Sequence, residues 1–306
     1  MMGANYNGEA YTLKHSILKK AAALFSALTV LSLTGCAGGA VQSSTPQPEA
    51  PAVTGNVTVT AFNVGKADAL VVQTQNTVTV IDAGNKGDGK YIDKFLTAQG
   101  IDTVDLMIIT HFDKDHVGGA SRVINKMNVK EVLVPNYESE LEEYKSFVEK
   151  VEETETPVTK LDFGTSREWA PDDITCTVYA SEKNNYGRDE ENDFSLVMYM
   201  QHGENTFLFT GDAEDPRQQE IIRLNLGKVD FLKFPYHGNY MPTTEKFLDA
   251  LDPKYTVVCC SEKEYADPNT VETLENRKIE TYYTCDGNVT VVSDGKTLTC
   301  TQEPAK

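Results

Sequence analysis

The feature that most constrains the fold is a short loop in which two histidines and two aspartates directly follow an apolar strand. The strand is predicted at Val104–Ile109, and the ligand-type residues after it are His111, Asp113, Asp115 and His116. Imidazole and carboxylate groups can converge on metal ions when the loop that carries them is held between a strand and a helix. Gly118–Gly119 lets the backbone turn sharply there. An acidic loop can contain two aspartates by chance, but two framing histidines favour a metal site.

Histidine is rare in this chain, so the position of each histidine is informative. There are five, of which two share this loop and His15 lies near the N-terminus. His237 follows a second apolar strand, predicted at Val229–Lys233. His202 precedes Gly203 between two predicted strands, so we expect it in a hairpin turn at the surface.

Two further aspartates stand where apolar strands end. Asp212 follows the run Phe207–Gly211, and Asp82 follows the predicted strand Thr77–Ile81. Alone, Asp212 would usually cap a helix and Asp82 would usually belong to a turn. Because polar side chains recur at strand ends, we expect them to share one site on a mixed α/β scaffold.

The hydrophobic periodicity predicts an α/β (α+β) domain. Strands are expected at Val57–Phe62, Ala69–Thr74, Thr77–Ile81, Val104–Ile109, Lys130–Val134, Ile174–Tyr179, Ser195–Met200, Thr206–Phe209, Val229–Lys233 and Tyr255–Cys259. Helices are expected at Lys90–Ala98, Gly119–Lys126, Ser139–Val151, Pro216–Asn225, Thr244–Leu251 and Asn269–Glu275. A final hairpin turns at Asp294-Gly295. Two mixed sheets with helices outside them are the simplest packing of this order.

The order of the motifs resembles the metallo-β-lactamase superfamily. These motifs are Asp-x-Gly at Asp82–Gly84, His-x-Asp-x-Asp-His-x-Gly-Gly at His111–Gly119, Thr-Gly-Asp at Thr210–Asp212 and Lys-x-x-x-His-Gly at Lys233–Gly238. The segment Phe62–Ala69 and the Asn-x-x-Ser of Asn192–Ser195 are similar to the hydrolase domain of the ComEC DNA-uptake protein and its free-standing relatives. The resemblance implies a four-layer αββα sandwich.

The resemblance also implies two divalent metal ions, Zn²⁺ or Mn²⁺. Carried over residue by residue, it gives the first ion His111 and Asp113, the second ion Asp115, His116 and His237, and both ions the bridging Asp212. Asp113 stands where many members of the superfamily have histidine. An additional hard oxygen ligand favours Mn²⁺ or a mixed site.

Further residues are expected around the ligands. Asp82 would orient a ligand histidine. Asn192 and Ser195 would lie near the place where other branches have one more histidine, and Tyr236 stands where this branch often has a second histidine.

A dinuclear centre of this kind implies hydrolysis, in which a shared hydroxide attacks the substrate. Asp115 is the candidate for holding that hydroxide and taking its proton, so Asp115 and His116 are the expected catalytic residues. Lys233, Tyr236 and Asn192 are alternative donors to the developing oxyanion. The sequence does not choose among these three.

The charge of the chain limits the substrate. The formal charge is −18, and without residues 1–35, which hold three lysines and one glutamate, 25 basic and 45 acidic residues leave −20. A protein this acidic is not expected to bind polyanions over an extended surface. Together with the resemblance, this favours a small phosphodiester or a short nucleic acid, and no protein partner is evident.

Two other functions are weighed against the phosphodiesterase. A surface lipoprotein that binds metal or ligand without turnover would be expected to lose a ligand such as His111, Asp115, His116 or Asp212, and none is lost. A lactonase or β-lactamase is disfavoured by Asp113 and by the lack of a clear histidine in the third motif.

The N-terminus has the pattern of a lipoprotein export signal. Lysines precede the apolar run Ala21–Leu31, and Leu33–Cys36 resembles a bacterial lipobox. We therefore expect a signal peptide at 1–35, an acylated Cys36, a flexible tether at 36–55 and a hydrolase domain at 56–302, anchored outside the cell membrane. The alternative is a plain signal peptide with an incidental cysteine.

Five other cysteines occur, at Cys176, Cys259, Cys260, Cys285 and Cys300. None forms a C-x-x-C pair, so a thiolate zinc site is not expected. In an exported protein, Cys285 and Cys300 are candidates to bridge the terminal hairpin. The alternative is that they act as small apolar residues.

Overall fold

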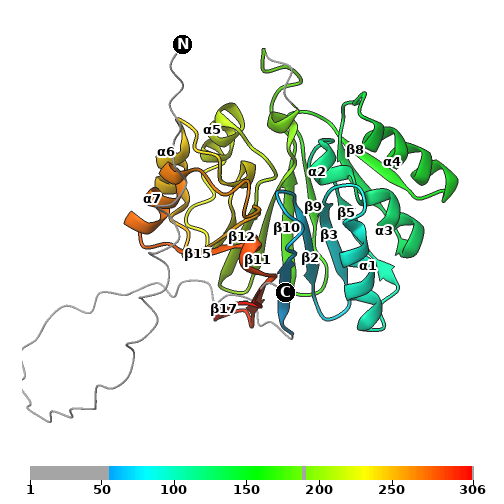
Figure 1. Ribbon diagram of the computed structural model, residues 1–306, viewed down its shortest axis with the longest axis horizontal. Helices are drawn as coiled ribbons and strands as arrows, with labels where there is room; N and C mark the ends of the chain where they lie inside the picture. Colours follow the sequence, from blue (N-terminus) through cyan, green and yellow to red (C-terminus); the bar gives the residue numbers. More distant parts are fainter. Residues whose placement is uncertain (1–54, 188–190, 305–306) are drawn as a thin grey trace, which may run out of the picture. The chain divides into compact units, whose positions relative to one another are not determined.

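Two β-sheets lie face to face, and helices cover their outer faces (Figure 1). The computed structural model describes residues 55–187 and 191–304, which belong to one compact unit. The expected signal peptide, Cys36 and nearly all of the tether lie outside the described residues. The helix, sheet, sheet, helix layering confirms the α/β sandwich that the sequence predicts.

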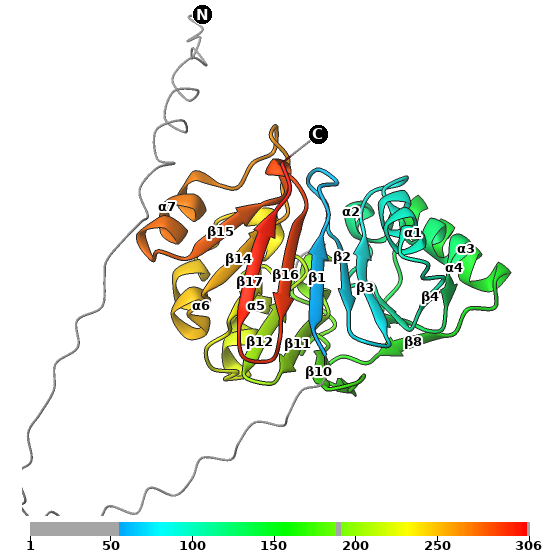
Figure 2. The ribbon, with the colours of Figure 1, turned by 90° about the horizontal axis from the view of Figure 1, so that it is seen from below.

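The first sheet has eight strands. In spatial order they are β17 (Leu298–Gln302), β16 (Val289–Ser293), β1 (Val57–Ala61), β2 (Ala69–Gln73), β3 (Val78–Ala83), β5 (Leu106–Ile108), β7 (Val132–Pro135) and β8 (Val158–Leu161). The strands from β17 to β3 pair antiparallel, and those from β3 to β8 pair parallel. Figure 2 shows the C-terminal hairpin β16–β17 beside β1, so the two ends of the described chain share one sheet.

The second sheet repeats this design with seven strands. They are β15 (Glu280–Tyr283), β14 (Tyr255–Val258), β13 (Phe231–Lys233), β12 (Asn205–Phe209), β11 (Val197–His202), β10 (Ile174–Tyr179) and β9 (Ser166–Trp169). The strands from β12 to β15 are parallel, and those from β9 to β12 are antiparallel. A small separate pair joins β4 (Thr103–Val104) to β6 (Asn128–Val129).

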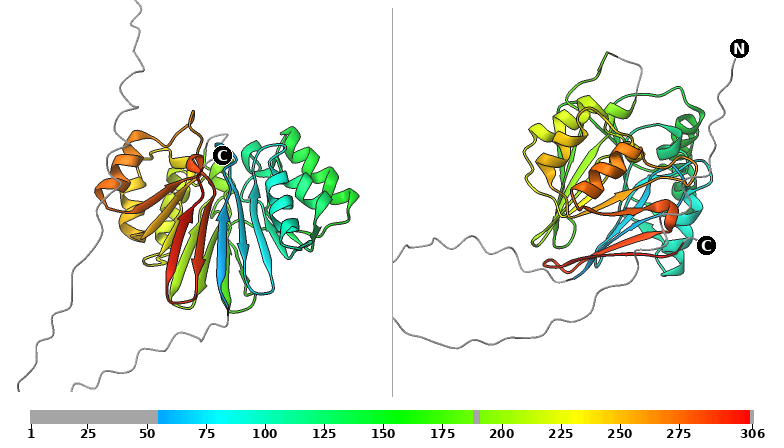
Figure 3. Two further views of the ribbon diagram at one scale, coloured as in Figure 1. Left: turned by 60° about the horizontal axis from the view of Figure 1, so that its bottom comes forward. Right: turned by 60° about the vertical axis from the view of Figure 1, so that its left-hand side comes forward.

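Each sheet has its own helices on its outer face, as both views of Figure 3 show. Beside the first sheet lie α1 (Gly89–Ala98), α2 (Lys114–Val117), α3 (Ala120–Lys126) and α4 (Glu142–Glu153). Beside the second lie α5 (Asp215–Arg223), α6 (Thr244–Leu251) and α7 (Pro268–Asn276). None of these described helices combines the length and apolar character needed to cross a bilayer.

Alternating side chains build three layers of core. Along β1, Val57, Val59 and Ala61 point between the two sheets, where they meet Phe209 and Phe231 of the second sheet. Burying each large side chain of this kind stabilises the fold by roughly 1.5–3 kcal/mol. One outer core lies between the first sheet and its helices, and another lies between the second sheet and its helices. Strands covered on both faces are therefore apolar on both faces, as the continuous apolar runs predict.

The sequence-based elements agree with most of the structure and miss its edges. The bounds of β10 and α6 are those predicted. The edge strands β8, β9 and β15 were not predicted, because most of their residues are exposed or half-buried. The strand predicted at Val104–Ile109 is divided at Asp105, whose carboxylate accepts from the amide of Val78 at 2.9 Å.

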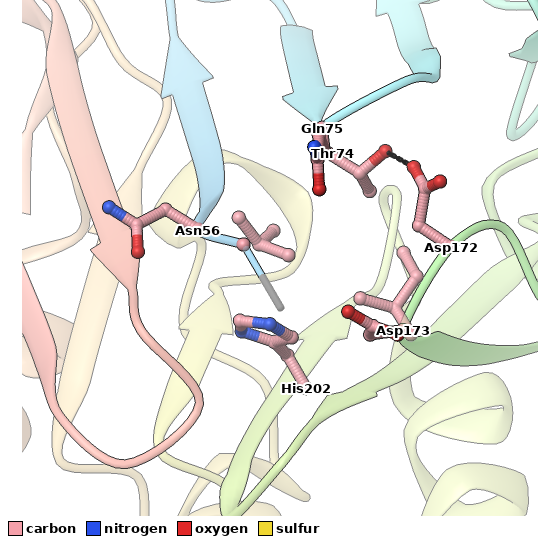
Figure 4. Close-up of a pocket in the computed structure, with 9 residues that line it drawn as sticks. Asn56, Thr74, Gln75, Asp172, Asp173 and His202 are labelled. Carbon is pink, nitrogen blue, oxygen red and sulfur yellow. Dashed lines mark hydrogen bonds between the residues drawn. The ribbon is translucent and has the colours of Figure 1, made fainter. Parts of the chain in front are cut away.

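The expectation that His202 lies at the surface is wrong. The hairpin of β11 and β12 packs against the C-terminal hairpin, and the amide of Glu204 donates to the carbonyl of Gly295 at 2.7 Å. His202 is therefore buried, with its Nδ1 2.8 Å from Ser293 Oγ, and burial lowers its pKa. His202 and Asp173 line a cavity of about 10 Å³. Figure 4 draws the residues around it. This volume is far too small for a substrate.

The structure does not place Cys285 and Cys300 opposite each other in the terminal hairpin, so they do not bridge it. Cys300 lies on β17 opposite Val291, whereas Cys285 lies in the short 3₁₀ helix η3 (Thr284–Asp286) before the hairpin. All five cysteines of the described chain are free thiols. The sulfur of Cys285 lies 3.7 Å from the sulfur of Cys260.

Candidate metal centre

Loops from both sheets meet at one edge of the sandwich. The loop of His111–His116 follows β5, Asp212 follows β12, and His237 lies in the 3₁₀ helix η2 (Tyr236–Gly238) after β13. The amide of Leu196 donates to the carbonyl of Thr110 at 2.9 Å, which joins the first sheet to the second. The polar side chains at strand ends thus come together as the sequence predicts.

Two of the histidines and two of the aspartates form a tight group. Asp212 Oδ2 lies 3.3 Å from His116 Nε2 and 2.9 Å from His237 Nε2. His237 Nε2 also lies 3.2 Å from Asp115 Oδ2. His116, His237 and Asp212 are almost fully buried, so these atoms face one another away from bulk water.

The other two expected ligands lie beside this group. The rings of His111 and His116 have centroids 4.0 Å apart, and His111 Nε2 is 3.7 Å from Asp113 Oδ2. His111 is fully buried, whereas the side chain of Asp113 is 38% exposed. The site therefore opens to solvent on the side of Asp113.

Each histidine is held through its Nδ1 atom. His116 Nδ1 lies 2.8 Å from Asp82 Oδ2, His237 Nδ1 lies 3.0 Å from the carbonyl of Cys259, and His111 Nδ1 lies 3.0 Å from Thr110 Oγ1. A carboxylate and a carbonyl only accept, so His116 and His237 carry their proton on Nδ1. Their Nε2 lone pairs are then free for another partner.

The Nε2 atoms fit a metal ion. Those of His111, His116 and His237 are buried and have no hydrogen-bond partner, although carboxylate oxygens lie close to them. A buried polar atom without a partner costs about 1–3 kcal/mol. Imidazole nitrogens next to carboxylate oxygens are the donor set that Zn²⁺ and Mn²⁺ bind in proteins. The residues present therefore suit divalent metal ions.

The charges of the group act in the same direction. Burial opposes the ionised form of Asp212, yet His237 and His116 hold the pKa of this carboxyl well below its usual range. Burial lowers the pKa of His237, but the charge of Asp212 raises it to about 9. The carboxylates thus stabilise positive charge at the position of the imidazoles. A field of this sign also attracts divalent cations.

Sequence reasoning missed Asp68. This residue, His116, Asp212 and His237 offer ligand atoms within 4.8 Å of one another, and all four are buried. Asp68 precedes β2, which is antiparallel to β3, so the start of β2 lies at the same edge as the end of β3. Two signals could have been used: its position before an apolar strand, and its place in the segment Phe62–Ala69 that carries part of the family resemblance.

The contacts of Asp68 identify it as the partner of a buried lysine. Asp68 Oδ2 forms an ion pair with Lys233 Nζ. The oxygens of Asp68 lie 3.7 Å from His237 Nδ1 and 4.0 Å from His116 Nδ1, atoms that Cys259 and Asp82 already engage. Because the unpartnered Nε2 atoms face Asp212 instead, we take Asp68 as a neighbour of the ligand set.

Lys233, one of the three alternative oxyanion donors, is buried and contacts other groups of the protein. It is 1% exposed, and its Nζ contacts Asp68, the carbonyl of Gly211 at 2.9 Å and Asp212 Oδ1 at 3.4 Å. Burial lowers its pKa, but the charges of Asp68 and Asp212 raise it further, so the ammonium stays charged. These contacts use the N–H donors of Lys233, which disfavours it among the three alternative donors to a substrate oxyanion.

The remaining expected residues lie around the group. Ser195 Oγ accepts from the amide of Asp212 at 3.1 Å and lies 3.4 Å from His111 Nδ1. Asn192 is buried, and its amide donates to Glu214 Oε1 at 2.8 Å while its Oδ1 has no partner. Ser195 thus supports two of the expected ligands, whereas Asn192 is tied to Glu214.

The backbone around His237 is tightly constrained. Tyr236, His237 and Gly238 have φ values of 48°, 51° and 84°, which turn the chain sharply after β13. A Cβ at Gly238 would lie 2.7 Å from the Cβ of Ala266, so glycine is needed there. Left-handed non-glycine residues cost about 1–3 kcal/mol each and cluster at functional sites. Tyr236, the residue before His237, is half-buried.

Comparisons with known proteins agree with this geometry. A family model of the metallo-beta-lactamase superfamily matches residues 63–262. ComE operon protein 3 of Bacillus subtilis is 31% identical over 182 residues, which cover 55% of this chain and 21% of that protein. Recombination protein 2 of Haemophilus influenzae is 24% identical over 205 residues, which cover 65% of this chain and 24% of that protein. The chain therefore spans less than a third of the length of either relative.

A solved structure shares the fold. A variant of the CmlA beta-hydroxylase superimposes with a TM-score of 0.50 at 16% identity, covering 78% of this chain and 53% of that chain. At this identity the likeness concerns the arrangement of sheets and helices and not the reaction.

Proposed function

The chain belongs to the metallo-β-lactamase superfamily, and on that premise we propose that it is a metal-dependent phosphodiesterase acting on small phosphodiesters or short nucleic acids. The fold is that of metal-dependent hydrolases, and its residues suit divalent metal ions. The observation that carries the proposal is the convergence of three buried histidines. Each is held through Nδ1 and has an Nε2 atom without a hydrogen-bond partner beside a carboxylate: His111 beside Asp113, His116 beside Asp212, and His237 beside Asp115 and Asp212.

The proposed ligands are those implied by the motifs. One ion would be held by His111 and Asp113, the other by Asp115, His116 and His237, with Asp212 shared. When bound, such ions supply activation of water at neutral pH and neutralise charge on the substrate.

The protein's own groups have separate roles in this proposal. Asp115 lies at the open side of the group, with its side chain 21% exposed, and takes the proton of the attacking water. Asp82 keeps the proton of His116 on Nδ1, and Lys233 holds the second oxygen of Asp212. Tyr236, half-buried beside His237, is the candidate donor to the developing oxyanion.

The choice of substrate rests on charge and on the relatives. One of the relatives is named a recombination protein, and this name points to nucleic acid. The charge of −20 expected without residues 1–35 disfavours a long duplex held by a basic surface. A short substrate held at the metal centre satisfies both observations.

We also propose that the domain is displayed outside the cell membrane on a lipid anchor at Cys36. The lipobox-like sequence Leu33–Cys36 supports this. Cys36→Ala is expected to release the protein from membranes with its hydrolase activity unchanged, which cell fractionation would measure. Retention of the variant in the membrane fraction contradicts the lipid anchor.

The phosphodiesterase is tested with two variants of adjacent residues. His116→Ala and Asp115→Asn should each reduce turnover of bis-p-nitrophenyl phosphate and of a short oligonucleotide by about 10²-fold or more. Asp102→Asn, an exposed aspartate in the loop before β4, is the control and should act like wild type. If the metal-loaded wild type cleaves neither substrate, the protein is not a phosphodiesterase. Cleavage of lactones or β-lactams instead, or metal binding without turnover, would identify the alternative.

A further inference from the structure

Two buried cysteines from neighbouring strands have their sulfur atoms 3.7 Å apart. Cys260 follows β14, and Cys285 follows β15. The strands are parallel, with Val258 opposite Tyr283. Two residues further along this register, Cys260 is opposite Cys285. The proximity of the thiols thus follows from strand pairing and is not a chance contact of loops.

The backbone that carries the two thiols is held in place. The amide of Cys260 donates to Thr284 Oγ1 at 3.1 Å, and this hydroxyl lies 3.3 Å from the carbonyl of Cys260. The residues Cys260 and Cys285 are 0% and 6% exposed. A disulfide requires the sulfurs to approach from 3.7 Å to about 2.05 Å.

We propose that Cys260 and Cys285 form a disulfide when the protein meets a small-molecule or protein disulfide. The thiolate of Cys285 attacks one sulfur of the donor disulfide and expels the other as a thiolate. The thiol of Cys260 loses its proton to solvent and attacks the Cys285 sulfur, which releases the second donor sulfur as a thiolate. Two cysteines are oxidised, and one donor disulfide is reduced to two thiols.

The surroundings favour this pair over the other cysteines. The Cys260 thiol donates to the Cys285 sulfur, which lowers the pKa of Cys285 and makes it the better nucleophile. Burial raises the pKa of Cys176 and of Cys300 to about 12, so both thiols stay protonated. Burial also raises the pKa of Cys259, whose neighbours include Asp68.

The bond would close a segment that packs against the turn at His237 and Gly238. The segment between the two cysteines includes Ala266, which packs on Gly238, and Asp267, whose amide donates to the carbonyl of Gly238 at 3.0 Å. The residue before Cys260 supplies the carbonyl that holds His237 Nδ1. The disulfide would therefore fix the segment that packs on Gly238 and the strand end that supports His237. It does not depend on the reaction that the site carries out.

Peptide mapping tests the proposal directly. The full-length chain is reduced, treated with oxidised glutathione and digested with trypsin without reductant. The expected product joins the peptide Tyr255–Lys263 to the peptide Ile279–Lys296, with a mass 2 Da below their sum. The melting temperature should rise by roughly 5–10 °C, from the entropy of closing a loop of this length.

Matched variants locate the bond. Cys176→Ser and Cys259→Ser should both still give the linked peptides, whereas Cys285→Ser and Cys260→Ser should lose them together with the rise in melting temperature. Linkage through Cys300, or unlinked peptides after prolonged oxidation of the wild type, would overturn the proposal. Because the peptide Tyr255–Lys263 contains Cys259 as well as Cys260, fragmentation of the linked wild-type peptides assigns the bond even if a serine variant does not fold.

Discussion

Replacement of Asp82 by asparagine tests the account of how the histidines are prepared for metal. The carboxylate accepts from the amide of Thr110 at 2.8 Å, from the Thr110 hydroxyl at 2.7 Å and from His116 Nδ1 at 2.8 Å. Asp82 has a φ of 56°, a left-handed conformation that asparagine tolerates well. The exchange therefore changes hydrogen-bond polarity with little change in volume or backbone strain.

The structure indicates which hydrogen bond is lost. The oxygen of asparagine still accepts from the Thr110 amide, and the hydroxyl of Thr110 can turn to accept from the new NH₂ group. His116 Nδ1 must then also accept, which moves its proton to Nε2. An Nε2 that carries a proton has no lone pair for a metal ion. Outer contacts of this kind typically contribute 10–100-fold in metal affinity, which is about 1.4–2.7 kcal/mol.

Calorimetric titration of Mn²⁺ or Zn²⁺ into the metal-free full-length protein measures this effect. Asp82→Asn should weaken binding by about 10–100-fold. Asp93→Asn is the matched control, because Asp93 is also buried but pairs with Arg122 Nε at 2.6 Å between α1 and α3. It should leave metal affinity unchanged. Wild-type affinity in Asp82→Asn, with the variant folded, would refute the reasoning.

Three further predictions concern stability and the metal loop. Arg217→Met should lower the free energy of unfolding by about 3–5 kcal/mol, because it leaves the buried Glu220 carboxylate, 2.8 Å away, unpaired. Urea denaturation measures this, and an unchanged midpoint contradicts it. Burial lowers the pKa of His202 below 6.5, so its contribution to stability is present above that pH and is lost as pH falls below it. Thermal melts between pH 5 and 8 should show a flatter profile for His202→Asn, and an identical profile would contradict this. Gly119→Ala should abolish metal binding in elemental analysis, because a Cβ there would lie 2.0 Å from the carbonyl of Ala83; full metal content would show that the loop adapts.

The parts of the site that could be predicted are those encoded locally. The position of polar residues after apolar strands identified His111, His116, Asp212 and His237. This pattern is informative because β5 of the first sheet and β12 and β13 of the second sheet end at the same edge of the sandwich. Periodicity located the strands that are buried on one or both faces. It did not locate β8, whose alternation is weak at the edge of the sheet.

The parts that could not be predicted depend on packing between distant segments. His202 was placed at the surface because its turn reads as polar, and only the contact with the C-terminal hairpin buries it. Asp68 and Lys233 lie 165 positions apart, and their ion pair exists because β2 and β13 belong to different sheets that meet at one edge. Nothing in the local sequence of Lys233 distinguishes a buried counter-ion from a substrate contact.

The most direct test of the central claim is the dependence of bis-p-nitrophenyl phosphate hydrolysis on the number of metal ions bound to the full-length chain. The account predicts close to two ions per chain at saturation, a rate that vanishes with a chelator and returns as Mn²⁺ or Zn²⁺ is restored. At most one ion per chain at saturation, or a rate that a chelator does not change, would contradict it.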